Sequence, residues 1–236
     1  MKNQYFGDIN DYKKFGLLRS ILSATKLKIL VSWMLTEDDG STDGKFIEYL
    51  SEPDQWAKYD TDLYEEITVL LQQKTKRAVN LIESSKILGD TQYFSNIVPD
   101  HSENRITWLS ELKKCALDKD LVFLDPDNGI EIKSKKFGTK NSSKFIYWRE
   151  IEELWASGKS LLIYQHFIRE KREVFIQRML NSLSEKTETS IVKAFSTSNV
   201  VFLLALQPKH QNDYERIINT VRSNWKDQIA CSEISS

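Results

Sequence analysis

The sequence predicts an α/β fold: a mostly parallel sheet with helices on both faces and a C-terminal antiparallel hairpin. Two observations favour this class. Short apolar runs bounded by turn residues alternate along the chain with segments of helical periodicity, as in proteins built on a parallel sheet. Near the C-terminus, two apolar runs flank Ser-Thr-Ser-Asn at 196–199, which is typical of a hairpin. Because neither a repeat nor a low-complexity linker divides the 236 residues, one domain over residues 1–236 is expected.

The expected strands are short and apolar. Strands of a parallel sheet are buried on both faces, so they appear as continuous apolar runs rather than alternating ones. Parallel strands are expected at 28–35, 91–98, 121–124 and 160–164, and hairpin strands at 191–195 and 200–206.

The expected helices carry apolar residues at a spacing of three and four. Asp8 or Asp11 can cap the first helix, and Gly158 can end the fourth in a left-handed conformation. Helices are expected at 11–24, 59–82 (a long helix and then a second segment), 105–116, 148–157, 169–183 and 214–225.

Composition narrows the classes of partner. Lysine plus arginine number 33 and aspartate plus glutamate 34, so no overall field favours nucleic acid or a membrane, although a local basic patch is possible. Two distant cysteines and three scattered histidines give no metal-ligand spacing, so no metal site is expected. The N-terminal segment lacks a signal-peptide core, and no apolar run approaches the roughly 18 residues of a membrane helix. We expect a cytoplasmic protein without a membrane partner; its oligomeric state is not predicted.

The clearest local signal is the apolar run at 121–124, which stops at Asp125 and Pro126. Proline cannot donate a ladder hydrogen bond, so the strand must end there and present Asp125 at its carboxyl end. Ligands of open α/β sheets bind at that edge. An ordinary strand followed by a turn explains the same residues without a function.

A second signal opens the chain. Gly7, Asp8, Asp11 and Lys14 precede and enter the first helix. A helix N-terminus offers free N–H groups, and a lysine one turn in can hold a carboxylate. The alternative is a capped amphipathic helix whose acids complement its dipole.

This opening segment resembles the N-terminal motif of the ribosomal-RNA methyltransferases that modify an exocyclic amine of adenine in the large-subunit RNA. Their pattern is Gly-Asn-x-x-Asp-x-x-Lys-His; here Asp8 stands for the asparagine and Phe15 for the histidine. The resemblance implies a Rossmann-like methyltransferase domain, or a degenerate branch of that family, with S-adenosylmethionine as cofactor. The cofactor-binding residues implied are Gly7, Asp8, Asp11, Lys14, Ser32 and Trp33. After Trp33 the expected glycine-rich turn is missing, since the next glycine is Gly40.

The stretch from Asp125 to Asn128 resembles the Asp-Pro-Pro-Tyr motif of amino-methyltransferases. It implies that Asp125 accepts a hydrogen bond from the attacking amine, which is a poor nucleophile that needs positioned acceptors. Asp127 and Asn128 replace the second proline and the aromatic residue, so Tyr5, Phe6 or Trp33 would have to stack on the base. The catalytic residues implied are Asp125, Pro126 and Asn128. His166 is a further catalytic candidate because it ends another predicted strand and a histidine there could act as a base.

The expected substrate contacts follow the same edge. Gln165 and His166 end another predicted strand, and a lysine-rich stretch follows Asp127. Lysines there could contact phosphates of RNA or DNA, although a solvated loop explains them as well. The expected substrate-binding residues are Tyr5, Phe6, Asp127, Gln165, Lys133, Lys135 and Lys136. The function predicted is therefore methyl transfer to nucleic acid or a nucleotide.

Two alternatives remain open. A methyltransferase-like protein without catalysis could bind nucleic acid or a partner protein. A divalent-metal-dependent nuclease has residues of the types Asp127, Glu131 and Lys133, but places the aspartate and the Glu-x-Lys on adjacent strands. Three residues between Asp127 and Glu131 leave no room for that, so this alternative requires Asp90 or Glu83 as the first metal ligand.

Overall fold

The computed structural model describes residues 1–37, 46–73 and 76–234 and confirms the α/β fold class. Its main sheet has seven strands in the order β2-β1-β3-β6-β8-β7-β9, of which β2, β1, β3 and β6 are parallel. A second pair, β4 and β5, lies beside it. The strands are β1 (Ile29–Ser32), β2 (Gln92–Phe94), β3 (Leu121–Leu124), β4 (Gly129–Ile130), β5 (Phe145–Ile146), β6 (Ser160–His166), β7 (Val192–Ser196), β8 (Val200–Ala205) and β9 (Ala230–Ser232).

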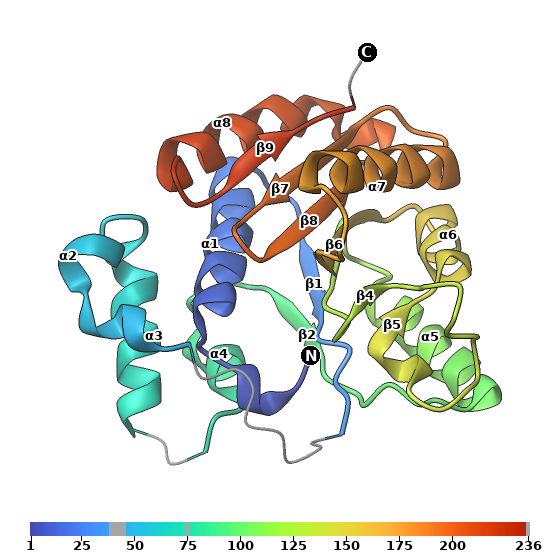
Figure 1. Cartoon of the computed structure of the whole chain (residues 1–236), viewed down its shortest axis with the longest axis horizontal. Helices are drawn as coiled ribbons and strands as arrows, with labels where there is room; N and C mark the ends of the chain where they lie inside the picture. The colour runs from blue at the N-terminus through green and yellow to red at the C-terminus, as the bar shows by residue number, and fades with distance from the viewer. Residues whose placement is uncertain (38–45, 74–75, 235–236) are drawn as a thin grey trace.

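Helices cover both faces of the sheet, which divides the core into two apolar clusters. One face is covered by α1 (Ile9–Ala24), α3 (Thr61–Gln73), α4 (Asn80–Ser85) and α8 (Tyr214–Trp225). The other is covered by α5 (Ser102–Cys115), α6 (Trp148–Ala156) and α7 (Arg172–Thr187) (Figure 1). The short helix α2 is Pro53–Trp56, and 3-10 turns cover Asn3–Tyr5, Glu48–Ser51, Ser142–Lys144 and Pro208–Asp213.

The strand β3 shows why the sheet is encoded as continuous apolar runs. Leu121 and Phe123 pack into the cluster beneath α1 and α8, whereas Val122 and Leu124 pack into the cluster beneath α5 and α7. Successive side chains of a strand point to opposite faces, and here both faces are covered.

The predicted hairpin is present but does not form the edge of the sheet. Strands β7 and β8 pair antiparallel, and β8 also pairs antiparallel with β6, so the hairpin lies inside the sheet. The outer strand is β9, which the sequence did not indicate because it is only three residues long and partly exposed. Strand β8 thus runs against both of its neighbours.

In the part of the chain that the structure describes, no helix is long and apolar enough to cross a membrane.

Candidate functional site at the carboxyl edge of the sheet

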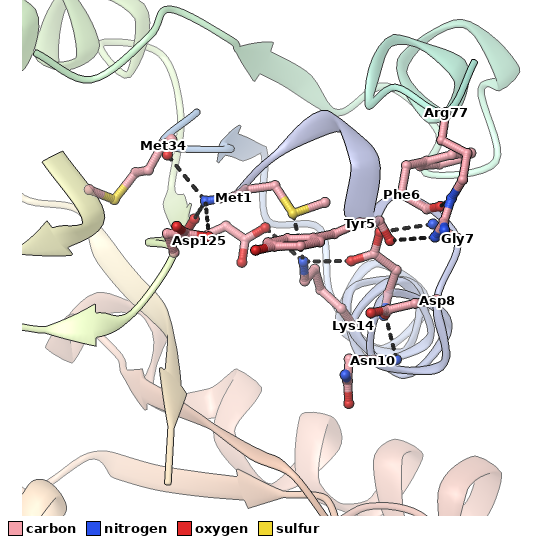
Figure 2. A network of polar contacts seen from close by, with 12 residues as sticks. Met1, Tyr5, Phe6, Gly7, Asp8, Asn10, Lys14, Met34, Arg77 and Asp125 are labelled. Atoms are coloured by element: carbon pink, nitrogen blue, oxygen red, sulfur yellow. Dashed lines mark hydrogen bonds and ion pairs between the residues drawn. The ribbon is translucent and has the colours of Figure 1, made fainter. Parts of the chain in front are cut away.

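The first turn of α1 and the end of β3 build a buried ion triad. Lys14 Nζ lies 2.7 Å from Asp11 Oδ1 and 2.7 Å from Asp125 Oδ2, and all three side chains are buried (Figure 2). Burial alone would lower the pKa of Lys14, but the carboxylates of Asp11 and Asp125 outweigh it and raise that pKa. The lysine is therefore held charged between two carboxylates from distant parts of the chain.

Asp8 is the N-cap of α1, one of the two residues predicted for that position. Its Oδ1 accepts hydrogen bonds from the main-chain N–H groups of Asn10 and Asp11, both at 2.9 Å. The other oxygen of Asp11 accepts the N–H of Gly7 at 3.0 Å. Burial, together with the nearby carboxylate of Asp11, raises the pKa of Asp8 to about 6. Two carboxylates thus share the start of one helix.

This raised pKa predicts a pH-dependent effect of Asp8→Asn. The pKa of about 6 in the folded protein lies above the ordinary aspartate pKa of 3.8, so the contribution of Asp8 to stability is complete below about pH 4 and is lost as pH rises through about 6. Asparagine keeps a cap oxygen and cannot ionise. The free energy of unfolding of Asp8→Asn, relative to that of wild type, should therefore rise by about 1–3 kcal/mol when the pH is raised from 4 to 7.5.

Urea denaturation of both proteins at the two pH values measures this gain. A difference between variant and wild type that stays the same at both pH values would contradict the assignment.

The main chain at the ends of β1 and β3 is also engaged by the N-terminal segment. The amino group of Met1 donates to the carbonyl oxygen of Asp125 at 3.0 Å and to that of Met34 at 3.2 Å (Figure 2). Met34 has a φ of +46°, a left-handed conformation that favours glycine. Met34 adopts it two residues after the end of β1; Gly40, the first glycine after β1, lies outside the described residues.

The end of β6 supplies three polar or aromatic side chains. Gln165 Oε1 accepts the N–H of Ile130 at 2.6 Å, which joins β6 to the small β4–β5 pair. The ring of His166 packs edge-on against Tyr164, with centroids 5.0 Å apart. Burial lowers the pKa of His166 against the opposing charge of Asp127, so the ring is neutral at neutral pH. Lys14 Nζ lies 5.0 Å from the centre of the Tyr164 ring.

A cleft of about 510 Å³ opens at this edge. It is bounded by the segments that follow β1 and β2 and by the segment that precedes β5. Its wall contains the carboxylates of Glu37 and Asp100, and the ammonium of Lys144, which lies 3.9 Å from Asp127 Oδ2. The lining residues are Thr36, Glu37, Ile97, Val98, Pro99, Asp100, Asn141, Ser143 and Lys144.

Most of the residues singled out in the sequence come together at this edge. The start of α1 and the two residues before it supply Gly7, Asp8, Asp11 and Lys14. The segment after β3 supplies Asp125, Pro126 and Asp127, and the end of β6 supplies Gln165 and His166. Asn128 is exposed, and its main-chain N–H donates to the carbonyl of Lys144 at 2.8 Å. Lys133 and Lys136 are exposed, and Lys135 donates to the carbonyl of Lys140 at 2.9 Å.

The aromatic residues expected to stack on a base lie mostly in the core. Phe6 and Trp33 are fully buried, and Trp33 Nε1 donates to Glu83 Oε1 at 2.8 Å. Tyr5 is half-buried. Ser32 is buried too, and its hydroxyl has no hydrogen-bond partner within the described ranges.

Sequence reasoning missed the left-handed conformation at Met34, for which the sequence carries no signal. Tyr164 belongs to the same predicted strand end as Gln165 and His166, and Lys144 to the lysine-rich stretch, but neither was among the expected site residues. Glu83 and Glu131, named for the nuclease alternative, bind Trp33 Nε1 and the main-chain N–H of Trp148. Among the residues with described positions, no group of three or more His, Cys, Asp or Glu side chains could hold a metal ion.

Comparison of the sequence with protein-family models and with curated proteins gives no match.

Proposed function

We propose that this protein binds S-adenosylmethionine in the cleft at the carboxyl edge of the sheet and transfers its methyl group to nucleic acid or a nucleotide. The observation that carries the proposal is the position of the cleft. The cleft lies between the two segments that follow β1 and β2 and the segment that precedes β5. One of its lining residues, Lys144, is 3.9 Å from Asp127 Oδ2. Ligands of open α/β sheets bind at this edge. The two segments that resemble methyltransferase motifs, residues 7–14 and 125–128, approach the same edge.

The chemistry of the cleft suits such a cofactor. Ile97, Val98 and Pro99 give an apolar wall for a purine ring, and the exposed carboxylate of Glu37 can accept hydrogen bonds from hydroxyl or ammonium groups. Bound there, S-adenosylmethionine would supply an electrophilic methyl group. The protein's own part is to hold the acceptor amine in line and accept its hydrogen bonds.

The geometry favours Asp127 over Asp125 as the residue that meets the acceptor. Asp125 Oδ2 is bound to Lys14, and its carbonyl oxygen accepts from Met1. Among the described residues Asp127 makes two long ion pairs, at 4.0 Å to the Met1 amino group and 3.9 Å to Lys144, so its oxygens can still accept hydrogen bonds. In this proposal Asp125 is a positioning residue that holds Lys14 and the end of β3.

Calorimetric titration with S-adenosylmethionine and S-adenosylhomocysteine tests the cofactor site. Ile97→Trp fills the cleft and should weaken binding at least about tenfold, or ~1.4 kcal/mol. Ile106→Trp is the matched control, because Ile106 on α5 is 54% exposed, against 55% for Ile97, and does not line the cleft. The assignment would be overturned if the wild-type protein bound neither compound, or if both variants weakened binding equally.

A second candidate, binding without methyl transfer, is favoured by one observation. Both the carboxylate and the carbonyl of Asp125 are held by groups of the chain itself, unlike the free acceptor that the motif implies. Transfer of a labelled methyl group to RNA, DNA or nucleotides distinguishes the two. Cofactor binding with no labelled product from any of these acceptors would favour the binding protein.

A further inference from the structure

A loop of concentrated positive charge borders the cleft. This lysine loop, residues 132–144, contains five lysines and no acidic residue, although the whole chain has a net charge of −1. Like charges so close in sequence repel each other, at a cost that a polyanionic partner would remove. The lysines are Lys133, Lys135, Lys136, Lys140 and Lys144.

The lysine loop is held in place by its surroundings. Asp100 accepts the main-chain N–H groups of Asn141 and Ser143, both at 2.7 Å. The ring of Phe137 packs edge-on against Tyr147 with centroids 5.1 Å apart, and the guanidinium of Arg149 lies 4.0 Å from the Phe137 ring centre. The charges are therefore presented on an ordered scaffold, which lowers the entropy cost of binding.

Three of these lysines are available to a ligand. Lys133, Lys136 and Lys140 are exposed, and no carboxylate of the described residues lies within ion-pair distance of their ammonium groups. The nearest acids in sequence serve other groups, since Glu131 accepts the N–H of Trp148 at 2.8 Å.

We propose that the lysine loop binds the phosphodiester backbone of a nucleic-acid strand and guides one of its nucleotides to the cleft. Asn141, Ser143 and Lys144 belong to both the loop and the cleft wall, so phosphates bound by the loop lie at the cleft mouth. The exposed guanidinium of Arg149 offers a face on which a base can stack. Binding of the strand does not depend on the proposed function. Delivery of a nucleotide to the cleft rests on the proposed function, and it makes a polynucleotide, not a free nucleotide, the methyl acceptor.

The test is fluorescence anisotropy with short labelled single-stranded RNA and DNA across a range of salt concentrations. The variant combines Lys133→Gln, Lys136→Gln and Lys140→Gln. The control combines Lys26→Gln, Lys209→Gln and Lys226→Gln, three exposed lysines outside the loop, and changes the net charge equally. Thermal melts establish that both proteins fold.

We expect the loop variant to bind at least about tenfold more weakly and its slope of log affinity against log salt to be shallower by about 2, at ~0.7 per lost phosphate contact. The control should match wild type. Equal affinities and slopes for the two variants would overturn the proposal. So would loop-dependent binding of anionic phospholipid vesicles without binding of either oligonucleotide. Titration of the loop variant with S-adenosylmethionine separates failure of this proposal from failure of the proposed function. If the cofactor site is intact, the loop variant should bind S-adenosylmethionine as tightly as wild type does, whether or not it binds the oligonucleotides.

Discussion

Replacement of Lys14 with methionine should lower the free energy of unfolding by about 3–5 kcal/mol, the usual cost of removing one partner from a buried ion pair. The change leaves Asp11 and Asp125 buried, close together and without their shared cation. Methionine fills a similar volume, so the loss reports the uncompensated carboxylates and not a cavity. The midpoint and slope of urea denaturation measure the effect.

The neighbouring residue provides a matched control. Lys13 is also buried on α1, but its ammonium lies 5.4 Å from the ring centre of Trp56, where Lys14 has two carboxylates. Lys13→Met should therefore cost less than about 1 kcal/mol. The combined change Asp11→Asn, Lys14→Met and Asp125→Asn should recover part of the loss because it removes the charges together. Similar losses for Lys13→Met and Lys14→Met would contradict the triad as the source of the effect.

Gly16→Ala should destabilise the protein by about 1–3 kcal/mol or more, the usual range for overpacking a core. This loss is opposite to the effect expected from helix propensity, because replacing glycine with alanine in a helix interior normally raises stability by about 1 kcal/mol. A Cβ on Gly16 would lie 1.8 Å from Trp225 Cζ2, so α1 and α8 could not keep their separation. Trp225 is itself fully buried and stacked on Tyr59, which leaves it little room to move.

A double-mutant cycle isolates this contact. Trp225→Leu removes the ring that the new methyl group would meet, so Gly16→Ala should cost much less in that background. Urea denaturation of wild type, both single variants and the double variant gives the coupling energy. If Gly16→Ala stabilises the protein, or costs the same in both backgrounds, the close approach of the two helices is not the reason for the glycine.

The sequence by itself determined the elements whose signal is complete within one segment. The apolar run at 121–124 matches β3, and the periodic segment at 214–225 matches α8, both without a shift at either end. The hairpin and the Asp8 cap were also predictable, because turn residues and cap oxygens act on neighbouring residues. The placement of Asp125 at a strand's carboxyl end followed from that apolar run and from Pro126, which cannot continue the strand.

The tertiary structure decided what depends on residues far apart in the chain. The insertion of β8 between β6 and β7 and the outer position of β9 follow from sheet order, which no local pattern encodes. The sequence placed Lys14 at a helix start but could not select Asp125, 111 residues away, as its partner. It also could not tell that Phe6 and Trp33 pack in the core, because an aromatic residue beside a helix start or a strand end suits either a ligand or the interior. Burial is a property of the assembled layers, and the sheet brings the polar residues of α1, β3 and β6 to one edge only once those layers form.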